Sequence, residues 1–165
     1  MDAAAEMAAR LAGLHEIAEP WPHGVEDDFL PPDLFAELLA SLPDVAKAQN
    51  STQDLPASVL AVLKDPRVEA AIRSRFGFTA HKAQIELTCR RKRIAGHSDR
   101  QDKAWSGIVY LAGDPVGTEL YDTKRVLAKV VEFKPNRLLC WGKRGEQHAV
   151  PESQGRFAIQ WWFLK

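Results

Sequence analysis

The sequence predicts an α+β fold: a double-stranded β-helix (jelly roll) of about eight strands, buttressed by N-terminal helices. Two observations support this prediction. Apolar residues recur at helical spacing over the first 77 positions, whereas short β-type runs separated by turn residues follow from residue 80 onward. Eight short strands in about eighty residues are typical of a sandwich or barrel, and the jelly roll is the eight-strand arrangement of that kind.

The length of the chain, 165 residues, predicts a single domain (1–165) with a helical support layer at 1–79 and a jelly-roll core at 80–165. Met7 and Leu11 share one apolar stripe of the first helix. Asp65 is an expected N-cap and Gly77 an expected stop for the last helix. The four expected helices lie near residues 2–14, 31–43, 59–63 and 65–77.

Glycine, proline, aspartate and asparagine separate the β-type runs, and these residues favour turns. Gly113-Asp114-Pro115 is one such break, and another is expected at residues 143–145. The eight expected strands lie near residues 83–90, 93–97, 104–111, 118–121, 127–133, 137–142, 147–150 and 156–164.

The overall composition indicates a cytoplasmic protein with no nucleic-acid or membrane partner. The formal net charge is +0, so no global field attracts nucleic acid or an anionic membrane surface. No apolar run is long enough to span a bilayer, and the alanine-rich start lacks the basic region of a secretory signal. Cys89 and Cys140 both fall in expected strands without a CxxC pair, which indicates two buried thiols in a reducing compartment.

His97, Asp99 and His148 are candidate metal ligands. In an extended segment, side chains two positions apart project to the same face, so His97 and Asp99 point together. The second and seventh strands of a jelly roll are neighbours, which brings His148 beside them. Two imidazoles and one carboxylate with open positions are typical of non-haem Fe(II) oxygenases. The alternative is that these residues have no common role: His97 lies in a turn, Asp99 begins a loop, and His148 is a core histidine that is hydrogen-bonded to the backbone.

Arg156 begins the last strand on the same phase as Gln160 and Trp162, which we expect to face inward. A buried guanidinium needs a partner, and the carboxylate of a bound small molecule satisfies it in a bidentate manner. The alternative is an arginine that reaches solvent. Phe157 and its alternate neighbours are expected to face the helical layer.

The ordered set His97-x-Asp99, His148 and Arg156 resembles the Fe(II)/2-oxoglutarate-dependent oxygenases, especially their prolyl-hydroxylase-like branch. The resemblance covers about residues 80–164, and its last part, Arg156 to Phe163, matches the family's final strand closely. By resemblance, His97, Asp99 and His148 bind iron, and Arg156 holds the distal carboxylate of 2-oxoglutarate. Gln160 stands where the family often has a hydroxyl residue that assists this carboxylate.

The resemblance implies a dioxygenase that hydroxylates an unactivated C–H bond and releases succinate and CO2. Its substrate would be a small metabolite, an amino acid or a peptidyl residue. Related halogenases have a small residue in place of Asp99, so the carboxylate argues for hydroxylation. Trp162 replaces a second arginine typical of nucleic-acid dealkylation in this family. Two alternatives stay open: a cupin-like metal enzyme that does not use 2-oxoglutarate, and a catalytically silent binding protein of the same fold.

The most basic stretch, Cys89 to Arg93, lies just before His97. A solvated hairpin is the simpler interpretation of this charge run. The functional alternative is electrostatic attraction of an anionic substrate toward the mouth of the pocket. Gln84, Glu86 and Thr88 alternate along the preceding strand and are candidates to line the pocket.

Overall fold

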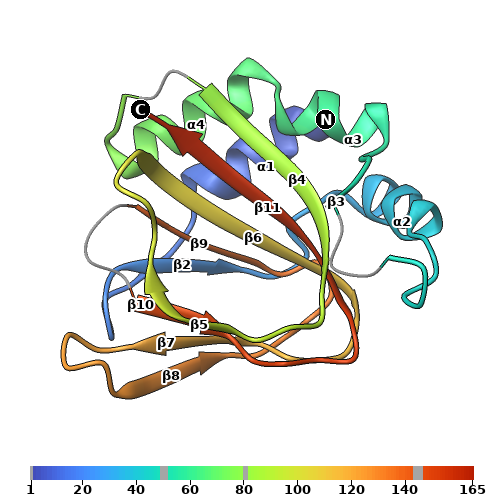
Figure 1. Ribbon diagram of the computed structural model, residues 1–165. Coiled ribbons are helices and arrows are strands. Elements are labelled where there is room, and N and C mark those ends of the chain that lie inside the picture. Colours follow the sequence, from blue (N-terminus) through green and yellow to red (C-terminus); the bar gives the residue numbers. More distant parts are fainter. Residues whose placement is uncertain (1, 49–51, 80–81, 143–146) are drawn as a thin grey trace.

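The computed structural model describes residues 2–48, 52–79, 82–142 and 147–165. Within them lie four helices and two antiparallel sheets (Figure 1). The helices are α1 (Ala3–Ala12), α2 (Pro32–Ser41), α3 (Ala57–Leu63) and α4 (Pro66–Phe76). The strands are β1 (Glu16–Ile17), β2 (His23–Glu26), β3 (Thr52–Gln53), β4 (Lys82–Arg90), β5 (Ile94–Ser98), β6 (Lys103–Gly113), β7 (Thr118–Tyr121), β8 (Leu127–Val131), β9 (Leu138–Gly142), β10 (Gln147–Val150) and β11 (Arg156–Leu164).

The helix boundaries follow from local capping. The carboxylate of Asp2 accepts a hydrogen bond from the Ala5 amide at 2.9 Å, and Asp65 accepts one from the Arg67 amide at 2.9 Å. Gly77 ends α4 in the left-handed region, with φ of 63°, which glycine adopts without steric cost. The predicted N-cap and stop of α4 are therefore confirmed.

The seven-stranded sheet has the order β1-β2-β9-β6-β11-β4-β3, and the four-stranded sheet has the order β5-β10-β7-β8. Figure 1 shows the helices on one side of the larger sheet and the smaller sheet on its opposite side. Each of the eight predicted strands is present, with ends within two residues of the expected ones. Residue 80 and the turn expected at 143–145 lie outside the described residues.

The expected number of about eight strands is too low, because the described residues form eleven. The three additional strands, β1, β2 and β3, lie among segments that were expected to hold only helices and loops. They are two to four residues long, too short for alternation of apolar and polar residues to be recognised. β2 is an extended segment because its backbone pairs with β9, with Gly24 opposite Cys140.

The two faces of β11 pack against different layers. Phe157, Ile159, Trp161 and Phe163 belong to one apolar cluster with buried residues of α1, α3 and α4. Ala158 instead joins a second cluster between the two sheets, with Tyr110, Leu120 and Trp141 among its members. The predicted phase of this strand is therefore confirmed, and Arg156, Gln160 and Trp162 lie on the face that carries the candidate site.

The thiols of Cys89 and Cys140 are both free and fully buried, as the sequence predicts. In the part of the chain that the structure describes, no helix is both long and apolar enough to cross a membrane.

Candidate metal centre and adjoining cavity

Pairing of β5 with β10 brings two histidines together. His148 lies directly opposite His97 in this antiparallel pair, and their ring centroids are 4.4 Å apart. Asp99 follows the end of β5. One ligand atom from each of His97, Asp99 and His148 lies within 4.8 Å of the other two. The structure thus brings together the three residues that the sequence suggested, with His148 buried and His97 exposed.

The carboxylate of Asp99 is held by three side chains. Its Oδ1 accepts from the ammonium of Lys103 at 2.9 Å. Its Oδ2 accepts from the hydroxyl of Ser106 at 2.5 Å and from the indole N–H of Trp141 at 3.0 Å. The ammonium of Lys103 also lies 4.3 Å from the ring centroid of Trp162. These supporting contacts fix the rotamer of Asp99.

The surroundings of Asp99 favour its ionised form. Burial alone would raise the pKa of this carboxyl group. The hydrogen bond from Ser106, the nearby His148 and the ammonium of Lys103 outweigh burial and hold the pKa below its usual value. Asp99 therefore offers a charged oxygen ligand at neutral pH.

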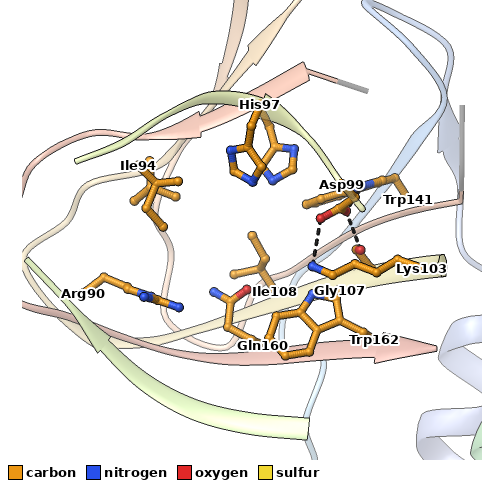
Figure 2. A pocket seen from close by; sticks show the side chains of 13 residues that line it. Arg90, Ile94, His97, Asp99, Lys103, Gly107, Ile108, Trp141, Gln160 and Trp162 are labelled. Carbon is orange, nitrogen blue, oxygen red and sulfur yellow. Dashed lines mark hydrogen bonds and ion pairs between the residues drawn. The ribbon is translucent and has the colours of Figure 1, made fainter. Parts of the chain in front are cut away.

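A cavity of about 140 Å³ opens beside the three candidate ligands. In Figure 2, Asp99 and Lys103 lie on one side of it, Arg90 lies on the other, and Gln160 and Trp162 lie below His97. Its lining residues come from both sheets: Arg90, Ile94, His97, Asp99, Lys103, Ser106, Gly107, Ile108, Trp141, His148, Val150, Gln160 and Trp162.

Arg156 is wholly buried next to this cavity but does not line it. Its Nη1 donates to the carbonyls of Val116 and Gly117 at 2.8 and 3.0 Å, and its guanidinium lies 5.2 Å from the ring centroid of Tyr110. Among the described residues, its Nε and Nη2 have no hydrogen-bond partner. Buried donors without a partner are costly, so this guanidinium is suited to receive an anion.

The sequence interpretation of the basic stretch was incomplete, because its members differ. Arg93 is exposed and pairs with Glu119 at 3.4 Å, which agrees with a solvated charge. The expected hairpin is wrong, because β4 and β5 on either side of the stretch belong to different sheets. Arg90 is partly buried and lines the cavity.

The suggestion that Gln84, Glu86 and Thr88 line the cavity is wrong, because none of them is among its lining residues; on this face of β4, Arg90 is. Gln84 instead donates to Glu86 at 2.6 Å, and Thr88 donates to the carbonyl of Ala158 at 3.3 Å. The face that they occupy is the expected one, but their side chains bond to the sheet itself.

The donor set fits an Fe(II) ion. Two imidazoles and one carboxylate are its usual protein ligands in oxygenases, and they leave further positions open. Their ligand atoms, within 4.8 Å of one another, lie close enough together to be candidates for one shared ion. The unpartnered nitrogens of Arg156 likewise match a carboxylate, which accepts two parallel hydrogen bonds.

No protein-family model and no curated protein sequence matches this chain. Solved structures do match. A prolyl-4-hydroxylase from Pseudomonas putida is 18% identical over 99% of this chain and 94% of its own, with a TM-score of 0.69. A prolyl hydroxylase from Trichoplax adhaerens, in complex with a hypoxia inducible factor peptide fragment, is 16% identical over 98% of this chain and 88% of its own, with a TM-score of 0.61.

An oxidoreductase of the 2OG-Fe(II) oxygenase family from Burkholderia pseudomallei also matches. It is 16% identical over 99% of this chain and 90% of its own, with a TM-score of 0.55. At these identities the likeness is one of fold. The resemblance stated from the sequence is confirmed at this level: the chain has the fold of prolyl-hydroxylase-like 2OG-Fe(II) oxygenase structures.

Proposed function

We propose that this protein is a Fe(II)- and 2-oxoglutarate-dependent dioxygenase that hydroxylates an unactivated C–H bond. The observation that carries the proposal is the convergence of His97, Asp99 and His148 at the edge of a cavity. In each turnover, one oxygen atom of dioxygen would enter the product and the other would enter succinate, with loss of CO2.

Three residues would hold the metal, and other residues would hold the carboxylate of one of them, Asp99. His97 and His148 would each bind through a neutral ring nitrogen, and Asp99 through a charged oxygen. When bound, Fe(II) and 2-oxoglutarate supply the activation of dioxygen. Ser106 and Trp141 keep the carboxylate of Asp99 in one orientation, and Lys103 balances its charge. The retained carboxylate occupies a metal position that a halogenase would leave for halide, which supports hydroxylation.

Arg156 would orient 2-oxoglutarate by binding its distal carboxylate, with Gln160 as a further polar contact. Arg156 has two buried nitrogens without a hydrogen-bond partner in the described part of the chain, and Gln160 lines the cavity. This arrangement supports a co-substrate with a carboxylate at each end. A cupin-like enzyme that does not use 2-oxoglutarate would have no need of this anion position.

The substrate would be a small metabolite, an amino acid or a peptidyl residue. The Trichoplax relative in fold is bound to a peptide fragment, which supports a peptidyl residue as one substrate class.

A succinate-release screen tests the proposal. Purified protein with Fe(II) and 2-oxoglutarate would be incubated with pools of free amino acids and of peptides. We expect stoichiometric succinate and hydroxylated product with one pool, and loss of both in His148→Ala. Product that forms without succinate release, and equally well in Arg156→Ala, would indicate the cupin-like alternative. Absence of Fe(II) binding and of succinate with every pool would indicate a silent binding protein.

A further inference from the structure

Arg90 and Arg156 lie side by side on neighbouring strands. They are directly opposite each other in the antiparallel pairing of β4 and β11. Residues directly opposite in such a pair project to the same face, with Cβ atoms about 5 Å apart. Arg156 is buried on the inner face, so Arg90 projects to that face as well. The sheet register therefore places two guanidinium groups together beside the cavity.

No acidic side chain in the described ranges forms an ion pair with either arginine. The Nε of Arg90 is buried without a hydrogen-bond partner there, as are Nε and Nη2 of Arg156. Burial lowers the pKa of Arg156, and the like charge of Arg90 lowers it further. Two neighbouring cations that lack a counter-charge need an anionic partner.

The cavity connects Arg90 to the candidate metal ligands. Arg90 lines the cavity together with His97 and Asp99, whereas Arg156 is not among its lining residues. In Figure 2 the guanidinium of Arg90 points into the space toward Gln160. An anion in this cavity therefore has the guanidinium of Arg90 in the same space as the candidate metal ligands.

We propose that Arg90 is a second guanidinium for the distal carboxylate of 2-oxoglutarate, which it holds together with Arg156. This proposal rests on the proposed function. It assigns a positioning and specificity role to Arg90, which selects a 2-oxo acid that carries a second carboxylate. Two forks of donors on neighbouring strands can satisfy both oxygens of one carboxylate.

Binding measurements with two 2-oxo acids test this role without any turnover. Calorimetry would be done with Mn(II) in place of Fe(II), titrating either 2-oxoglutarate or pyruvate, which lacks the distal carboxylate. We expect Arg90→Met to weaken 2-oxoglutarate binding roughly ten- to a hundredfold, the loss expected for a hydrogen bond to a charged group. Pyruvate binding should change less than about twofold, because pyruvate has no group at this position.

Arg93→Met is the matched control, because it removes one positive charge from the same basic stretch outside the cavity. Its binding of both acids should equal that of the wild type. Arg90→Lys keeps the charge but not the fork of donors, and should recover part of the lost affinity. Thermal melting of each variant shows whether a loss of 2-oxoglutarate binding comes from misfolding. If Arg90→Met is misfolded, the affinity of Arg90→Lys decides the test.

Several results would overturn the assignment. If Arg90→Met binds 2-oxoglutarate as well as the wild type does, Arg90 does not hold its carboxylate. If the variant instead loses 2-oxoglutarate and pyruvate equally, Arg90 acts at the metal end. If only the KM for the hydroxylated substrate rises, Arg90 binds that substrate. A wild-type protein that binds neither acid with Mn(II) would refute the proposed function itself.

Discussion

At the scale of single residues, the candidate metal centre depends on side chains that are not themselves metal ligands. Asp99 is fixed by Ser106, Trp141 and Lys103 before any metal binds. Such partners of a ligand hold it in the orientation that a metal requires, and they keep the ligand ionised. The hydroxyl of Ser106 has the shortest of these contacts, at 2.5 Å.

Ser106→Ala is therefore expected to weaken Mn(II) or Fe(II) binding about ten- to a hundredfold, because Asp99 loses a hydrogen bond that fixes its carboxylate. Equilibrium dialysis under anaerobic conditions measures the affinity. Ser74→Ala, at an exposed position of α4, is the control and should bind metal like the wild type. Unchanged affinity in Ser106→Ala would mean that Ser106 does not support the ligand.

At the scale of secondary structure elements, the two residues that precede β7 connect the smaller sheet to Arg156. The carbonyls of Val116 and Gly117 accept hydrogen bonds from its guanidinium. A Cβ atom at Gly117 would lie 2.2 Å from the carbonyl oxygen of Val131 in β8. The backbone of Val131 cannot move aside as the end of a flexible side chain can, so its close approach to residue 117 requires glycine at that position.

Gly117→Ala should lower the free energy of unfolding by about 1–3 kcal/mol, because the methyl group would force β7 away from β8. Urea denaturation followed by circular dichroism measures this change. Gly96→Ala is the matched control in another strand, where the nearest atom to the added Cβ is 3.8 Å away. The control should change stability by less than about 0.5 kcal/mol. Equal stability of the two variants would contradict the contact at Gly117.

Asp27 joins the end of β2 to the turn before β9. Its Oδ1 accepts from Nε of Arg137 at 2.6 Å, and its Oδ2 accepts from Lys134 at 2.7 Å. The hydrogen bond from Arg137 is the main reason that the pKa of Asp27 falls to about 2, since burial acts in the opposite direction. A lowered pKa in the folded state means that ionised Asp27 stabilises the fold.

Asp27→Asn should therefore destabilise the protein at pH 7, and the difference from the wild type should shrink as the pH falls from about 4 toward 2. The stabilisation by ionised Asp27 disappears in this range because, as the pH falls, the carboxylate is protonated in the unfolded state near pH 4 and in the folded state only near pH 2. The midpoints of urea unfolding of the variant and of the wild type, measured at several pH values, test this prediction. Glu152→Gln, at an exposed position, should show no such pH-dependent difference. A constant difference for Asp27→Asn would contradict the assignment.

At the scale of the whole molecule, the sequence predicted what depends on local periodicity. Alternation along 156–164 gave the correct inner and outer faces of β11, and helix signals such as Asp65 and Gly77 gave the ends of α4. The neighbouring positions of His97 and His148 also followed, because strand order in a jelly roll is fixed once the strands are recognised.

Contacts between distant segments could not be predicted in this way. Trp141, 42 residues away in the sequence, donates to Asp99 because the end of β9 in the larger sheet meets the end of β5 in the smaller one. Arg90 reads in the sequence as one more charge in a basic run, and only its register with Arg156 distinguishes it from Arg93. The short strands β1 to β3 form through backbone pairing, which leaves little pattern in so few residues.

The central claim is that His97, Asp99 and His148 bind an Fe(II) ion that 2-oxoglutarate then chelates. Anaerobic titration of the protein with Fe(II) and 2-oxoglutarate, followed by visible absorption, tests this claim most directly. We expect a charge-transfer band that requires both additions, saturates with one Fe(II) per chain, and is absent in His97→Ala and His148→Ala. A wild-type protein without this band, or a band that survives in both variants, would contradict the assignment of the metal site.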